Sequence, residues 1–172
     1  MRRRRRRSIG IGPDKDAVIS DCGGYRYELW RRWDRSKPHA VFIELNPSTA
    51  DAQEDDPTIR RCVGFAEREG MGALHMFNLF PYQATDPKDL VEWLFCAHTE
   101  TKIPFDRNLK SLKAGIAAAE IVVACWGAFR VTSLMRIDHR QAIWGAGDKL
   151  LCLGRTKSGR TETPALSQEG YL

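Results

Sequence analysis

The 172-residue sequence has no apolar run close to the roughly 20 residues that a membrane-spanning helix needs. It shows no secretory signal either, because the basic run at its start is followed only by the short, glycine-rich residues 9–13. Its five cysteines are odd in number, and no two are spaced as C-x-x-C. This cysteine usage is typical of a reducing compartment, so we expect a cytoplasmic protein with no membrane partner. Cys62, Cys125 and Cys152 lie in apolar segments and are expected to be buried in the core.

The motifs of the common cofactor sites are also missing. The four histidines are scattered without the spacing of zinc ligands. The chain has no G-x-x-x-x-G-K-[ST] loop for phosphates, no complete dinucleotide-binding loop and no G-x-S-x-G turn for a nucleophilic serine. We therefore expect neither a metal nor a cofactor.

Positive charge is concentrated at one end of the chain. The formal net charge is +5, and Arg2 to Arg7 contribute six positive charges, which leaves the rest of the chain near −1. This run has four interpretations: a contact for phosphates, an address signal, a disordered tail or an over-extended start of translation. We predict a disordered, arginine-rich tail over residues 1–16 and a single domain over residues 17–172.

The remaining pattern alternates short β-rich runs with amphipathic segments. Strands are expected over residues 17–20, 25–33, 41–45, 73–79, 120–125 and 149–153. Helices are expected to start at residues 56–57 and 86–87 and to cover residues 105–116 and 129–140. This order predicts the α/β class: a three-layer α/β/α sandwich whose central sheet is four-stranded and mostly parallel, plus an N-terminal β-hairpin.

The most informative segment is residues 46–51, Asn-Pro-Ser-Thr-Ala-Asp, which directly follows an apolar strand. Ligands of open α/β sheets bind beyond the carboxyl ends of the strands. Asn78 lies at the end of a second expected strand and Trp126 follows a third, so both should lie at the same edge as Asn46. An asparagine can pair with the edge of a nucleobase, and Phe80 or Trp126 can stack on its face. The alternatives are that Asn78 bonds its own turn and that Trp126 caps the sheet.

Several carboxylates follow this turn. Asp51, Glu54, Asp55 or Asp56 could orient or deprotonate a water molecule, as general bases do. The alternative is structural: Asp56 caps a helix, and Asp55 pairs with one of the two arginines at residues 60 and 61.

A set of motifs in fixed order resembles one family. The motifs are YRYELWRRW (residues 25–33), LNPSTAD (45–51), DDPTIRRC (55–62), NLF (78–80), ATDP (84–87), WG (126–127) and LGRTKSG (153–159). Together they resemble the bacterial and phage domain-of-unknown-function family numbered sixteen forty-three, over about residues 20–166. That family has no established activity.

A fainter resemblance is to the uracil-DNA glycosylase superfamily, which implies a three-layer sandwich around a four-stranded parallel sheet. It implies that Asn46 positions a water molecule and that Asn78 reads the base. Thr163 stands where a histidine is usual, and it offers a neutral hydroxyl to a departing base. Gln83 and Phe105 also depart from the pattern of the first family.

The leading hypothesis is a monofunctional DNA glycosylase that removes a modified or mismatched base from nucleic acid. The alternatives are a non-catalytic domain that binds nucleic acid or a nucleotide, and an enzyme acting on free nucleosides or nucleotides. The candidate catalytic residues are Asn46, Asp51 and Asp55. The candidate substrate-binding residues are Ser48, Thr49, Asn78, Phe80, Trp126 and Thr163. The candidate phosphate-binding residues are Arg60, Arg61 and Lys157.

Overall fold

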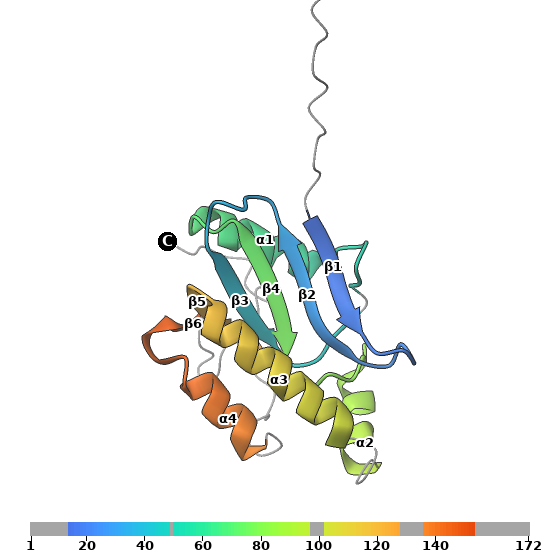
Figure 1. The fold of residues 1–172 in the computed structure, drawn as a ribbon. Helices are drawn as coiled ribbons and strands as arrows, with labels where there is room; N and C mark the ends of the chain where they lie inside the picture. Colours follow the sequence, from blue (N-terminus) through green and yellow to red (C-terminus); the bar gives the residue numbers. More distant parts are fainter. Residues whose placement is uncertain (1–13, 49, 97–101, 128–135, 154–172) are drawn as a thin grey trace, which may run out of the picture.

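The computed structural model describes residues 14–48, 50–96, 102–127 and 136–153. Figure 1 shows a twisted sheet with helices on both sides. The strands are β1 (Asp14–Ile19), β2 (Arg26–Arg32), β3 (His39–Glu44), β4 (Ala73–Asn78), β5 (Ile121–Ala124) and β6 (Leu150–Cys152). The helices are α1 (Pro57–Arg68), α2 (Pro87–Cys96), α3 (Lys102–Ala118) and α4 (Ile137–Trp144), with a short 3-10 helix at Gly147–Lys149.

The strands form one mixed sheet of six strands in the order β1-β2-β4-β3-β5-β6. β4, β3, β5 and β6 run parallel, whereas β1 and β2 pair antiparallel with each other and β2 pairs antiparallel with β4. The predicted α/β class is therefore confirmed, but the predicted four-stranded, mostly parallel sheet is wrong in detail. The hairpin extends the sheet because Leu29 of β2 lies opposite Met76 of β4, and both side chains are fully buried.

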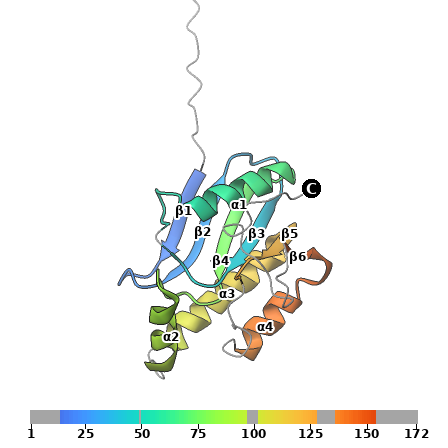
Figure 2. The same cartoon turned by 180° about the vertical axis from the view of Figure 1, so that it is seen from behind.

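Each face of the sheet has its own core. Phe42 and Met76 pack with Ile59 and Cys62 of α1 on one face. Ile43 and Phe77 pack on the other face, with Leu112 of α3 and Ile143 of α4 among their neighbours. Figures 1 and 2 show α1 on one side of the sheet and α3 and α4 on the opposite side. Since side chains alternate along a strand, the central strands β3, β4 and β5 supply both cores.

Helix α1 begins where the sequence predicts. The Asp56 side chain accepts a hydrogen bond from the backbone N–H of Ile59, and Pro57 occupies the first turn, where its missing N–H is not needed. Gly70, with φ of 78°, follows the helix in the left-handed region that glycine tolerates. Helix α4 spans Ile137–Trp144, later than predicted, and residues 128–135 of that prediction lie outside the described residues.

Two further sequence predictions, the burial of three cysteines and the extent of the N-terminal tail, are correct only in part. Cys62 and Cys125 are buried as predicted, but Cys152 is exposed, because β6 is the outer strand of the sheet. β1 starts at Asp14, within the segment predicted to be a tail, because the β1–β2 pairing extends to Arg32. No helix among the described residues is long and apolar enough to cross a membrane.

The packing of α3 on the sheet leaves no room at Gly115. A Cβ atom there would lie 2.3 Å from Cε2 of the buried Phe77 ring. Gly115→Ala is therefore expected to lower the free energy of unfolding by about 1–3 kcal/mol, measured by urea denaturation. Gly64→Ala in α1 is the matched control, since its Cβ would meet only Arg68 Nη1 at 4.0 Å. That control should gain about 0.5–1 kcal/mol from helix propensity, and equal effects of the two substitutions would contradict the packing argument.

Candidate functional site

An irregularity in the hairpin turns Arg26 toward the carboxyl ends of the parallel strands. In the β1–β2 ladder Val18 pairs with Glu28 and Ile19 with Arg26, so Tyr27 is an extra residue. Such a bulge re-aims the side chains beside it. The Arg26 guanidinium is buried, with its residue 1% exposed, and its Nη1 donates to the Ala50 carbonyl at 2.6 Å. A cation is thereby held inside the edge at which a ligand is expected.

Asn78 lies at the end of β4 and is the second buried polar group at this edge. Its Oδ1 accepts a hydrogen bond from Arg26 Nη2 at 3.3 Å, and its backbone carbonyl accepts one from Asn108 Nδ2 of α3 at 2.9 Å. The Nδ2 of Asn78 is buried and has no hydrogen-bond partner among the described residues. A buried donor without a partner costs about 1–3 kcal/mol, which an acceptor on a ligand would recover.

Glu44 ends β3 directly opposite Asn78 on the neighbouring strand. Alternation along β3 places it on the same face as Phe42, that of α1. Burial raises the pKa of Glu44 to about 7; the Arg26 cation opposes this rise and the Asp56 carboxylate adds to it. The side chain keeps partial exposure, and no described residue donates a hydrogen bond to its carboxylate. A carboxyl group that ionises near neutral pH at a strand end is suited to proton transfer.

Two residues of the loop after β3 and the start of α1 complete this arrangement. Ser48 Oγ donates to Asp56 Oδ2 at 2.6 Å, while Asp56 Oδ1 caps α1. Asp56 acts electrostatically on both Glu44 and Arg26. We call these five residues, Arg26, Glu44, Ser48, Asp56 and Asn78, the strand-end cluster. It combines one buried cation, an amide donor and a carboxyl group ready to accept a proton.

Asn46 serves as a tie between two loops. Its Nδ2 donates to the carbonyl of Ala84 at 2.7 Å and to that of Pro47 at 3.1 Å, which joins the loop after β3 to the loop after β4. Its Oδ1 makes no hydrogen bond to a described residue. The expected meeting of Asn46 and Asn78 at an open rim is not seen, since Asn78 is only 1% exposed and binds Arg26 and Asn108 instead.

The other two candidate carboxylates gather around Arg31. Asp55 Oδ1 accepts from Arg31 Nε at 2.7 Å, and the carbonyl of Asp51 accepts from Arg31 Nη2 at 2.7 Å. The exposed Asp51 carboxylate accepts two backbone N–H groups, from Gln53 and Glu54, which lower its pKa. Both carboxylates therefore hold the loop in shape.

The remaining candidate residues are not part of the strand-end cluster. Arg60 and Arg61 are exposed on the first turns of α1, and Arg60 Nη1 donates to the Asp55 carbonyl. Phe80 is 1% exposed and packs edge-on against Phe105 in the α3-side core. Trp126 is partly buried against that same core. Thr49, Lys157 and Thr163 lie outside the described residues.

Sequence reasoning missed Glu44 and Arg26, although each had a signal. Glu44 is the one charged residue in the apolar run over residues 40–45, and Arg26 sits between two tyrosines in a β-rich run. A charge at the end of a buried strand is rare without a function or a partner. The bulge that places the Arg26 guanidinium beside Asn78 had no signal in the local sequence.

The sequence matches the family model described as "Protein of unknown function (DUF1643)" over residues 26–165. This chain belongs to that family. The matched range includes Arg26, Glu44 and Asn78 and thus the whole strand-end cluster. No curated protein and no solved structure matches the chain, and nothing in these comparisons supports the fainter resemblance to uracil-DNA glycosylases. Membership of DUF1643 assigns no activity, so the function must be argued from the site.

Proposed function

We propose that this DUF1643 protein is a hydrolase that recognises a nucleobase and cleaves its N-glycosidic bond, in the manner of a monofunctional DNA glycosylase. The observation that carries the proposal is that Glu44, whose pKa is about 7, lies opposite Asn78 on the next strand, and that the buried Nδ2 of Asn78 has no hydrogen-bond partner in the part of the chain that the structure describes. A base offers acceptors for such a donor, and hydrolysis needs a general base of this pKa.

In the proposed reaction Glu44 takes a proton from a water molecule. The water oxygen bonds to the sugar C1′, the C1′–N bond breaks, and the base leaves with the bonding electron pair and is then protonated. Asn78 Nδ2 donates to an acceptor on the base edge. Arg26 favours the ionised form of Glu44, since its cation opposes the effect of burial on the Glu44 pKa.

Glu44 suits the role of general base better than the carboxylates expected from the sequence. Backbone N–H groups lower the pKa of Asp51, and Asp55 is paired with Arg31. Asn46 retains the proposed water-positioning role through Oδ1 alone, because its Nδ2 ties the two loops. Ser48 and Thr163 stay proposed contacts of the substrate, and Arg60, Arg61 and Lys157 stay proposed phosphate contacts.

The test is a measurement of base release by the purified full-length protein. Substrates are single- and double-stranded oligonucleotides carrying uracil, hydroxymethyluracil or another modified base, with the corresponding free nucleosides as a second arm. Free base is separated by chromatography, and abasic sites are detected by alkaline cleavage. We expect release from at least one oligonucleotide.

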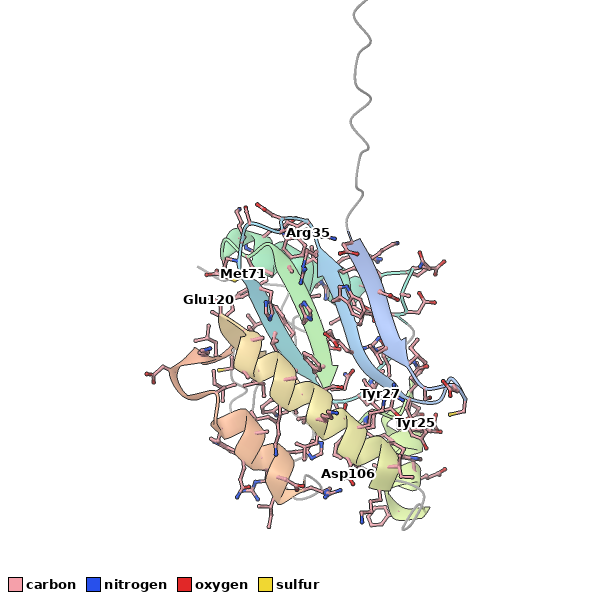
Figure 3. The ribbon with its side chains drawn as sticks, in the orientation of Figure 1. Tyr25, Tyr27, Arg35, Met71, Asp106 and Glu120 are labelled. Atoms are coloured by element: carbon pink, nitrogen blue, oxygen red, sulfur yellow. The ribbon has the colours of Figure 1, made fainter. Side chains whose placement is uncertain are left out.

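The matched control is Glu120→Gln, which removes an exposed carboxylate before β5, at the sheet edge opposite the strand-end cluster (Figure 3). It should leave the rate within about twofold of the unmodified protein. Release from free nucleosides only would favour a nucleoside hydrolase. Tight binding without release would favour a non-catalytic domain, and neither binding nor release would end the proposal.

A further inference from the structure

The face of the sheet opposite α1 carries a second feature, a groove of about 620 Å³ between β2, β4 and helix α3. Figure 3 shows this face of β1, β2 and β4 beside α3, with Tyr27 near one end of β2. The α3 residues that line the groove, from Arg107 to Ala118, recur at helical spacing along one side of the helix. The groove lies across the sheet from the strand-end cluster and shares no residue with it.

The walls of the groove have an excess of positive charge. Arg32 of β2 and Arg107 and Lys110 of α3 line it, and none of the three forms an ion pair with a described residue. The one carboxylate that lines it, Glu28, is held by Nδ1 of His75 at 2.6 Å. Three unneutralised cations around one groove favour an anionic ligand.

His39 adds a hydrogen-bonding group more than a charge to the groove, and it lies against His75. The ring centroids of His39 and His75 are 4.7 Å apart. Burial, followed by the neighbouring His75 and Arg32, lowers the pKa of His39, so its ring is neutral near pH 7. The anion would therefore be bound chiefly by Arg32, Arg107 and Lys110.

The cations are spread along the groove. The Arg107 guanidinium carbon lies 4.5 Å from the centre of the Tyr27 ring, so Arg107 marks one end. Arg32 lies at the far end of β2, five residues on from Tyr27, which is about 16 Å of backbone at the ~3.3 Å rise of a strand. Cations spread over this length of strand suit the successive phosphates of a chain better than a single phosphate group.

An aromatic side chain lies on the same face. Trp30 is partly exposed and lies between Glu28 and Arg32 on the same face of β2, since every second residue of a strand faces the same way. Its ring stacks on that of His75, with the ring centroids 6.4 Å apart and the planes 16° apart. Grooves that combine spaced cations with aromatic rings are typical of proteins that bind single-stranded nucleic acid, where bases stack on the rings.

We propose that this groove binds the phosphate backbone of a single nucleic-acid strand through Arg32, Lys110 and Arg107. The choice of nucleic acid among polyanions rests on the proposed function, whereas the anion site itself follows from the three cations. The groove would make the substrate a polymer rather than a free nucleoside.

The test measures binding of an unmodified, fluorescently labelled single-stranded oligonucleotide by anisotropy over a range of salt concentrations. All proteins are full length and carry glutamine in place of Arg2 to Arg7, so that binding by the terminal run does not mask the groove. The variant Arg32→Gln with Lys110→Gln should bind about tenfold or more weakly at low salt. A plot of log affinity against log salt concentration has a negative slope, and each phosphate contact to a single strand adds about 0.7 to its magnitude. Loss of two contacts should therefore reduce that magnitude by about 1.4.

The control pairs Lys113→Gln with Lys88→Gln, which removes two cations that do not line the groove. It should change affinity by less than about threefold, since such cations act only through screened, long-range charge. An unchanged slope in the groove variant, or an equal loss in the control, would overturn the inference. So would equal competition by a nucleoside monophosphate and the oligonucleotide, which would indicate a small phosphorylated ligand. Because the strand carries no modified base, this test can succeed or fail independently of base release.

Discussion

Replacing Glu44 by glutamine is expected to slow base release strongly while making the folded protein more stable at pH 8. The glutamine side chain has the same shape but cannot accept a proton from water, so the rate should fall by about 10²–10⁴. Loss of activity in a protein that has become more stable would separate a catalytic role from a structural one. Chromatographic detection of the free base measures the first effect, and urea denaturation measures the second.

The stability effect follows from the direction of the Glu44 pKa. Burial raises this pKa from an ordinary value of 4.5 to about 7 in the folded protein. The protonated carboxyl is therefore the form that folding favours, and its contribution is fully present below about pH 4.5. It is lost as the pH rises through about 7, where ionising a buried group opposes folding. Glutamine does not ionise, so Glu44→Gln should gain up to about 3 kcal/mol at pH 8 and almost nothing at pH 4.5.

The comparison for this substitution is Glu120→Gln, an exposed carboxylate outside the site. Its unfolding free energy should differ from that of the unmodified protein by less than about 0.5 kcal/mol at both pH values. A Glu44→Gln protein that is less stable at pH 8 would show that the carboxylate is a structural ion-pair partner of Arg26, which contradicts our account.

Replacing Arg26 by methionine is expected to have the largest effect on folding. Methionine retains much of the apolar stem but leaves the Ala50 carbonyl and Asn78 Oδ1 without their buried donors. Two such losses, both of bonds from the charged guanidinium, should cost about 3 kcal/mol of unfolding free energy. For a protein of this length that corresponds to a fall of about 6–12 °C in the melting temperature, measured by calorimetry.

The matched substitution is Arg35→Met, which has the same change of side chain at an exposed site (Figure 3). Arg35 pairs with Asp14 at 2.9 Å, but the two side chains are 69% and 45% exposed. Exposed ion pairs contribute about 0–1 kcal/mol, so this variant should unfold nearly as the unmodified protein does. Equal losses in the two variants would mean that the buried position of Arg26 has no special importance.

The elements that sequence reasoning placed well are those whose signals are local. Asp56 and Pro57 start α1 through their own backbone geometry, and the apolar spacing of α1 and α3 fixes which side each helix buries. The pairing of the hairpin with β4 was not predicted, because it depends on contacts such as Leu29 with Met76, which are far apart in the chain. Nothing in the residues of the hairpin indicates which edge it joins.

In the candidate site, too, the features with local sequence signals were predicted, and those that depend on contacts between distant residues were not. The sequence located the carboxyl edge of the sheet and identified Asn46, Ser48 and Asn78 as residues near it. It did not show that Asn78 is buried, because that depends on Arg26 from the hairpin and Asn108 from α3. The importance of Glu44 follows from a pKa that only the packing around it determines.

The most direct test of the account is the pH dependence of base release by the unmodified protein and by Glu44→Gln. If Glu44 is the general base, the rate of the unmodified protein rises with pH through a pKa of about 7 and then levels off, whereas the residual rate of the variant shows no such rise. A rise with the same midpoint in both proteins, or a flat profile in the unmodified protein, would contradict the assignment of Glu44.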